Sequence, residues 1–277
     1  MLREAWLWVR TPCAPAARRL GHLAEAIALS ARTRRQQRNW QSHHQHTRQA
    51  ILQVAAQCEQ RQLALILGAG ECHDVPVAEL AQHFERVVLV DIVLLPALRR
   101  RCKAFLNVEC HELDLTGLAA SIARPEAIRS AEDLPLLNAD AAAQSALTRL
   151  LHQLRCASGQ ISFVASVNLL SQLPVKPIDY LQQQMPSLPL SALNAFAWQL
   201  LRAHVQQLQT FRCPVCLITD DRQRTWNAAG EVVEEVALVA PLALESRVFA
   251  RWHWPLAPKG ELAHGCHAEH EVVAIRL

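Results

Sequence analysis

The feature that most constrains the fold is a run of five apolar residues, Leu63 to Leu67, that ends in Gly68-Ala69-Gly70. A continuous apolar run of this length is typical of a strand buried on both faces of a parallel sheet. The glycines let the chain turn sharply after the strand and let a ligand approach the backbone. The sequence therefore predicts an α/β sheet with a ligand site at the carboxyl end of this strand.

Strand and helix patterns alternate along the chain after this turn. Four more segments predict strands, at 87–90, 108–115, 161–167 and 213–219. Stripes at helical spacing predict helices, near 77–84, 98–105, 143–154 and 193–211. We expect a surface insertion or a broken helix at 118–142, a crossing segment at the mouth of the sheet at 168–190, and antiparallel strands within 224–277. Such alternation predicts a doubly wound, mostly parallel sheet.

Residues 1–61 differ in charge from the rest of the chain. They contain ten Arg, no Lys and three Glu, which is a net charge of +7, whereas residues 62–277 sum to −4. Residues 15–60 are rich in helix-forming residues and predict two or three helices. We therefore divide the chain into a basic helical cap, 1–61, and an α/β domain, 62–277.

Side chains of this helical segment allow two interpretations. Five arginines beside Trp40 form either a phosphate-binding face or an ordinary solvated helix face: Arg32, Arg34, Arg35, Arg38 and Arg48. Three histidines lie among Gln and Arg residues, and we expect them to be solvated: His43, His44 and His46.

The composition excludes several classes of protein. The longest apolar run, 87–98, is interrupted by Asp91 and Pro96, so it is too short to span a membrane. The first residues are charged and unlike an export signal, and we expect a cytoplasmic protein whose nine cysteines are reduced. Cys213 and Cys216 lie on a predicted strand, which would point their thiols to opposite faces. A second group comes closer to metal-ligand spacing but falls in a predicted loop between the final strands, so no metal is predicted: His264, Cys266, His267 and His270.

Acidic residues follow the predicted strands at the edge where a ligand would bind. Asp91 ends the second strand, 23 positions after Gly68, where a carboxylate can accept hydrogen bonds from ribose hydroxyls. Asp114 ends the third strand, and either aspartate could instead cap a turn. We expect Asp74 to cap the helix that begins at Pro76.

These segments resemble the class I S-adenosylmethionine-dependent methyltransferases. The similar stretches are LALILGAGECHDVPVAEL, VVLVDI, HELDLTG and ISFVASVNLLSQLP. The resemblance implies a seven-stranded sheet with antiparallel C-terminal strands, N-terminal helices over the mouth of the pocket, and S-adenosylmethionine as cofactor. A nicotinamide fingerprint would instead require glycine where His73 stands.

Carried over by position, the resemblance assigns cofactor contacts to four groups of residues. They are Gly68, Ala69 and Gly70 at the methionine part, Asp91 and Ile92 at the ribose, Asp114 and Leu115 at the adenine, and Val167 and Asn168 at the sulfonium. Asn168 could equally hydrogen-bond the turn after its strand. Two positions depart from the family pattern, because Ile66 stands where an acid is common and Cys72 where a third glycine is common.

The expected function is methyl transfer to an unidentified acceptor, a small molecule rather than a nucleic-acid base, because residues 166–170 lack the N/D-P-P-aromatic motif. The alternatives are a non-catalytic binding or scaffold protein, which the departures at Ile66 and Cys72 would suit, and an RNA-binding methyltransferase that uses the N-terminal arginines. No catalytic signature stands out. The weak candidates are Asp220, which lies next to Asp221 at the end of the fifth strand, and His204. Alternatively, the two aspartates bound a turn, and His204 is a histidine of the core.

Overall fold

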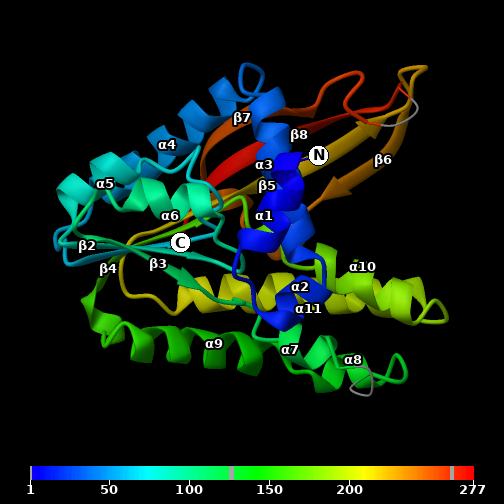
Figure 1. The fold of residues 1–277 in the computed structure, drawn as a ribbon, viewed down its shortest axis with the longest axis horizontal. Helices are drawn as coiled ribbons and strands as arrows, with labels where there is room; N and C mark the ends of the chain where they lie inside the picture. Colours follow the sequence, from blue (N-terminus) through cyan, green and yellow to red (C-terminus); the bar gives the residue numbers. More distant parts are fainter. Residues whose placement is uncertain (1, 125–127, 263–264) are drawn as a thin grey trace.

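The computed structural model describes residues 2–124, 128–262 and 265–277. Its centre is an eight-stranded sheet in the order β3-β2-β1-β4-β5-β8-β7, with β6 paired to β5 off this path. Strands β1 to β5 pair in parallel, whereas β6, β7 and β8 pair antiparallel to their neighbours (Figure 1). The predicted doubly wound sheet with antiparallel C-terminal strands is confirmed, and β6 is an additional strand.

The strands are β1 Leu63–Leu67, β2 Arg86–Asp91, β3 Val108–Glu112, β4 Ile161–Val167, β5 Val215–Trp226, β6 Val232–Ala237, β7 Val248–Ala257 and β8 His267–Arg276. The bounds of β1 and β4 agree with the prediction. Strand β5 does not end at Thr219, because its pairing with β8 continues through a register shift between Asp220 and Arg222. Asp220 and Asp221 therefore lie within a strand and do not bound a turn.

The helices are α1 Leu2–Arg10, α2 Pro15–Arg19, α3 His22–Arg35, α4 Gln41–Ala55, α5 Val77–His83, α6 Pro96–Cys102, α7 Ala119–Ile122, α8 Asp133–Leu136, α9 Ala139–Gln153, α10 Val175–Gln184 and α11 Leu190–Gln209. Helices α4, α5 and α6 cover one face of the sheet, and α9 and α11 cover the other (Figure 1). Short 3-10 turns connect several elements, among them Leu170–Gln172 after β4.

Alternate residues of the buried strands face the two helical layers, as the period of a strand requires. Ile66 and Leu89 belong to the core beneath α4, α5 and α6. Leu65 and Val88 belong to the core shared with α9 and α11. Every residue of β1 and β4 is buried. This explains why β1 is a continuous apolar run and why β4 has only the small polar residues Ser162 and Ser166 between its apolar ones.

The described residues of 118–142, which are 118–124 and 128–142, contain short helices and belong to the core, so they are not a surface insertion. They include the short helices α7 and α8 and the start of α9. Leu118, Ile122 and Leu134 are buried against Phe196 of α11. The helical period is interrupted here because several short helices, rather than one long helix, contribute apolar side chains to the same core.

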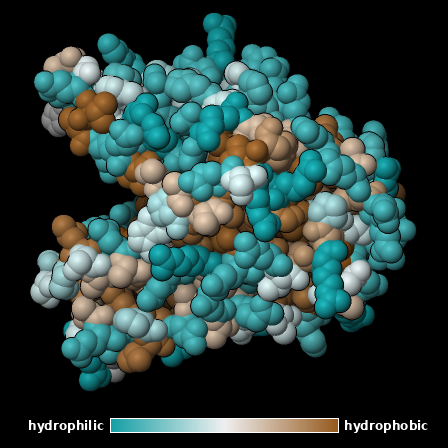
Figure 2. Space-filling model, turned by 180° about the vertical axis from the view of Figure 1, so that it is seen from behind, coloured by the Kyte–Doolittle hydropathy of each residue, from teal (hydrophilic) through white to brown (hydrophobic). Residues whose placement is uncertain are grey.

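Seen from behind, the molecule has a deep notch between the outer part of the β5–β8 region and the lobe that carries α8 and α10 (Figure 2). Apolar and polar residues are mixed over this face. Within the described residues, no helix combines the length and apolar character required to cross a membrane.

Candidate cofactor and acceptor site

A cavity of about 250 Å³ lies where the carboxyl ends of β1, β2 and β4 meet. Helix α3 contributes part of its wall through Ala26, Leu29 and Thr33, and the region of α10 closes another side through Pro177. All nine residues assigned to the cofactor line this one cavity: Gly68, Ala69, Gly70, Asp91, Ile92, Asp114, Leu115, Val167 and Asn168. The parallel sheet brings them together because each lies at or just after the carboxyl end of a strand.

The two glycines of the turn after β1 have different roles. Both have left-handed backbone, with φ of 79° at Gly68 and 52° at Gly70. A Cβ on Gly68 would lie 2.7 Å from the carbonyl oxygen of Val167, so the neighbouring strand requires glycine there. A Cβ on Gly70 would meet no atom within 4 Å. The open space beside Gly70, which lines the cavity, is a cradle into which a ligand can approach the backbone.

The surroundings of Cys72 and Ile66 explain how the chain accommodates these two departures from the family pattern. Cys72 is buried and has a φ of 54°, in the left-handed region that favours glycine. The chain therefore keeps the backbone conformation of a glycine at this position, although the residue is cysteine. Ile66 is fully buried in the core beneath α4, α5 and α6, where apolar neighbours suit an apolar side chain better than an acid.

Asp91 connects the second strand to the glycine turn. Its Oδ2 accepts a hydrogen bond from the backbone N–H of Gly70 at 2.7 Å, and its Oδ1 accepts one from the N–H of Ile92 at 2.7 Å. Burial raises the pKa of Asp91, and these backbone hydrogen bonds oppose the increase. A carboxylate offers about four acceptor positions, so the group can still accept hydrogen bonds from a ligand.

Asp114 organises the turn that follows β3. Its Oδ1 accepts hydrogen bonds from the N–H and the hydroxyl of Thr116, and its Oδ2 accepts one from the N–H of Ala119 at the start of α7. The turn-capping interpretation of this aspartate is therefore correct, and the residue also lines the cavity. Asp91 and Asp114 thus both shape the backbone at the rim.

The other end of the cavity is formed by aromatic and imidazole rings. Trp40, His43 and His44 come from α4 and the residue preceding it, and Trp254 comes from β7. The His43 ring stacks on Trp254 with centroids 3.8 Å apart and planes 9° apart. The expectation that His43 and His44 are solvated was wrong, because His43 is only 1% exposed and His44 is half-buried.

Both ring nitrogens of His43 have side-chain partners. Its Nδ1 lies 3.0 Å from the indole Nε1 of Trp252, and an indole N–H can only donate. Burial, followed by the neighbouring His44, lowers the pKa of His43 to about 3, so the ring is neutral at neutral pH. Its Nε2 lies 3.2 Å from the amide Nδ2 of Asn168, which also can only donate, so both ring nitrogens are in contact with donor groups.

Asn168, which follows β4, joins the two ends of the cavity. Its Nδ2 donates to Asp74 Oδ2 at 2.8 Å and lies 3.2 Å from His43 Nε2. The first residue outside α5 is Pro76, and no side chain caps this helix, so the prediction that Asp74 caps it was wrong. Asp74 instead lines the cavity beside His73.

Neither of the two catalytic candidates lines the cavity in the described chain. His204 of α11 is 3% exposed and its Nε2 lies 2.9 Å from the Ser166 hydroxyl, as expected for a core histidine. Asp220 is also 3% exposed, accepts a hydrogen bond from Ser171 and lies 3.0 Å from His270 Nδ1. Burial would raise the pKa of Asp220, but its contacts with His270 hold that pKa below its usual value.

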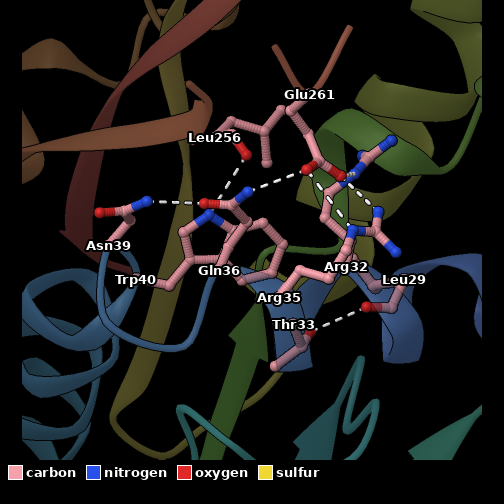
Figure 3. Close-up of polar contacts among 9 residues, drawn as sticks. All are labelled: Leu29, Arg32, Thr33, Arg35, Gln36, Asn39, Trp40, Leu256 and Glu261. Atoms are coloured by element: carbon pink, nitrogen blue, oxygen red, sulfur yellow. Dashed lines mark hydrogen bonds and ion pairs between the residues drawn. The ribbon is translucent and has the colours of Figure 1, made fainter. Parts of the chain in front are cut away.

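Some arginines of the predicted N-terminal basic face form contacts within the molecule. Glu261, after β7, accepts hydrogen bonds from Arg35 and Gln36 at the end of α3, and Arg32 lies beside it (Figure 3). The indole N–H of Trp40 donates to the Leu256 carbonyl at 3.2 Å. These contacts attach the end of α3 to the β7 side of the sheet.

Two of the other predicted arginines also have partners inside the chain. Arg34 donates to the Ser30 hydroxyl, and Arg48 donates to the carbonyl of His73 at 2.9 Å. Both contacts hold guanidinium groups close to elements that line the cavity. The predicted basic face is therefore not a row of uniformly solvated arginines.

The cysteine and histidine pairs do not form a metal centre in the described part of the chain, where no group of three or more candidate ligands gathers. His264 lies outside the described residues. His267 and His270 are in β8 and not in a loop, which corrects their predicted placement. All nine cysteines are free thiols.

The order of the strands, with β8 antiparallel between β5 and β7, is that of the class I methyltransferase fold, as the resemblance implied. Comparisons with known proteins find no matching family model and no matching curated protein.

Solved structures give distant matches. N-methyltransferase NodS from Bradyrhizobium japonicum WM9, with S-adenosylhomocysteine, is 10% identical over 85% of this chain and 86% of its own, with a TM-score of 0.37. Burkholderia thailandensis 1,6-didemethyltoxoflavin-N1-methyltransferase is 15% identical over 95% and 92%, also with a TM-score of 0.37. A putative tRNA (m1A22) methyltransferase from Streptococcus pneumoniae is 11% identical over 83% and 73%, with a TM-score of 0.30. With TM-scores this low, the fold assignment rests on the strand order of the sheet and not on these matches.

Proposed function

We propose that the protein is an S-adenosylmethionine-dependent methyltransferase that acts on a small-molecule acceptor. The observation that carries the proposal is the meeting of the glycine turn and Asp91 at one cavity, where the N–H of Gly70 donates to Asp91 Oδ2 at 2.7 Å. This contact fixes the carboxylate of the second strand beside the open cradle of the first. A nucleoside with an attached amino acid matches such a pair of features.

The residues present fit the cofactor because Gly70 leaves open space and Asp91 retains acceptor positions. Gly68, Ala69 and Gly70 would hold the methionine part, Asp91 and Ile92 the ribose, Asp114 and Leu115 the adenine, and Val167 and Asn168 the region of the sulfonium. When bound, the cofactor would supply an electrophilic methyl group. The chain itself would bind and orient the cofactor and the acceptor, and it would exclude water from the site. Displacement at carbon depends chiefly on the alignment of the reacting groups.

The aromatic end of the cavity supports a small, flat acceptor. The rings of Trp40, His43 and Trp254 form this wall, and stacked rings offer flat apolar surface to a planar ligand. His43 is neutral, so the wall favours an uncharged ligand over an anion. Helix α3 covers the cavity, which suits a compact molecule better than a nucleic-acid chain.

Calorimetric titration with S-adenosylhomocysteine tests the cofactor site. We expect binding by the unaltered chain, and a loss of about 1.5–3 kcal/mol in Asp91→Ala if its carboxylate accepts hydrogen bonds from the ribose. Asp140→Ala, which changes an exposed aspartate in the first turn of α9, is the matched control and should bind normally. Absence of heat and of a thermal shift at millimolar ligand would favour a scaffold protein instead.

A further inference from the structure

Several titratable side chains surround the acceptor end of the cavity, and their partners distinguish them. The site described above contains His43, His44, His73 and Asp74 at this end. Methylation of an N–H or O–H group requires removal of a proton, and a group that accepts it must have a free lone pair facing the acceptor. The polar partners of each side chain therefore decide which group can take the proton.

Three of these four groups already have polar partners. Both ring nitrogens of His43 are in contact with donor groups, Nδ1 with Trp252 and Nε2 with Asn168, so neither is available to the methyl acceptor. His73 Nε2 lies 3.5 Å from Glu71. Asp74 accepts the hydrogen bond from Asn168, and carboxylates are weaker bases than imidazole.

His44 is different because its contacts are with rings. Its centroid lies 6.2 Å from that of Trp40, in an edge-on arrangement, and 6.0 Å from that of His73, with planes 18° apart. Among the described residues, neither ring nitrogen of His44 has a hydrogen-bond or ion-pair partner. The side chain is half-buried and lines the cavity.

The charged and titratable surroundings of His44 keep its ring unprotonated at neutral pH. Burial is the largest influence and lowers the pKa of His44, and the neighbouring His73 and Arg48 act in the same direction. Asp74 opposes them. His43, from the same helix, is neutral. The carboxylate of Asp74 is thus placed to stabilise a positive charge that develops on His44.

We propose that His44 is the general base that takes the proton from the methyl acceptor, an assignment that rests on the proposed function. The acceptor nitrogen or oxygen forms a bond to the methyl carbon as the carbon–sulfur bond breaks. The electron pair of that bond returns to sulfur and leaves neutral S-adenosylhomocysteine. The proton leaves the acceptor for a ring nitrogen of His44, which becomes an imidazolium beside Asp74.

The first test needs no known acceptor. Imidazole C–H signals of the full chain are followed by NMR across pH 4.5–9 with saturating S-adenosylhomocysteine, and His44→Asn and His46→Asn assign the two signals. His46 is the matched exposed histidine on the same helix. We expect His44 to titrate below the ordinary histidine pKa of 6.5 and to be neutral at pH 7.5. A His44 ring that is protonated at pH 7.5 would overturn the proposal.

The second test measures methyl transfer from radiolabelled S-adenosylmethionine to two-ring aromatic compounds with a hydroxyl or amino group, such as 8-hydroxyquinoline and 3-aminoquinoline. For any compound that is methylated, His44→Asn should lower kcat by about 100-fold or more, and the acidic limb of the pH profile should disappear. His46→Asn should retain activity. Unchanged kcat and pH profile in His44→Asn would refute the assignment; if no compound reacts, the NMR titration decides.

Calorimetry separates this proposal from the proposed function. Failure of the unaltered chain to bind S-adenosylhomocysteine would contradict the methyltransferase assignment. Normal binding by both the unaltered chain and His44→Asn, with equal turnover, would contradict the role of His44 alone. Normal binding with lost turnover supports both.

Discussion

The two ends of the cavity are built from different kinds of groups. At the end formed by β1 and β2, backbone atoms dominate: Gly68 and Gly70 set the turn, and Asp91 holds it through backbone N–H groups. At the other end, side chains from distant segments meet, and the ring of His43 stacks on Trp254. The first end is suited to a ligand that does not vary, such as a cofactor. At the second end, substitution of a few side chains can change which ligand is preferred.

The largest expected effect is at the backbone end. In Gly68→Ala the new methyl group would lie 2.7 Å from the carbonyl oxygen of Val167, in left-handed backbone. Backbone strain of about 1–2 kcal/mol adds to overpacking of about 1–3 kcal/mol. We expect a loss of several kcal/mol, or failure to fold, in denaturant unfolding. A variant of wild-type stability would show that the turn can move and that the first end is not rigid.

The next effect concerns the side-chain end and its response to acid. The pKa of His43 is about 3 in the folded chain, below the ordinary value of 6.5. Between these two pH values the unfolded chain binds the extra proton, so stability falls as the pH decreases from 6.5, by up to about 1.4 kcal/mol per pH unit for one group. Denaturant unfolding at several pH values measures this slope.

The variants His43→Gln and His46→Gln identify the group responsible. Removing His43 should flatten the dependence on pH below 6.5, and His46→Gln is the control for replacing an exposed histidine of the same helix. The buried His204, whose pKa burial lowers to about 4, contributes to the slope that remains. An equal slope in all three proteins would mean that the neutral state of His43 does not influence stability.

A smaller effect separates ligand binding from stability at the backbone end. Gly70→Ala places a methyl group where no protein atom lies within 4 Å, so the folded chain should lose only about 1 kcal/mol from its left-handed backbone. The methyl group projects into space that the cofactor would need. We expect the affinity for S-adenosylhomocysteine, measured by calorimetry, to fall more than stability does. Unchanged affinity would place the ligand away from the turn.

The smallest effect is at the attachment of α3. Glu261→Gln removes the charge that faces Arg32 and Arg35, and partly exposed ion pairs contribute about 0.2–1 kcal/mol. We expect a slight decrease in stability, detectable as a small shift in the denaturant midpoint. A loss much larger than 1 kcal/mol would show that the attachment of α3 supports the cavity as a whole.

How much the sequence could reveal also differs between the two ends. The backbone end was predictable because Gly68 and Asp91 each follow an apolar strand, and parallel strands bring their carboxyl ends together. The rings of Trp40 and Trp254 come from segments more than two hundred positions apart, which local patterns cannot pair. One signal was present: Trp40, His43, Thr47 and Ala50 share the helical spacing of a buried face.

The placement of Asp220 shows a second limit. Its position after an apolar run suggests a strand end, but the antiparallel partner β8 extends the strand past it. Strand pairing with residues near the C-terminus thus determines whether this aspartate lies at a rim or in the interior. Local sequence does not contain that information, so Asp220 and His204 were candidates that the fold excludes from the cavity lining.

The stacking of an indole on an imidazole at the cavity wall has a spectroscopic consequence. Trp254 lies against the ring of His43, and Trp40 lies edge-on to Trp254. A molecule that enters between these rings would alter the surroundings of two indoles at once. The protein therefore carries its own optical reporter, and its intrinsic emission can follow occupancy of the acceptor end without any attached dye.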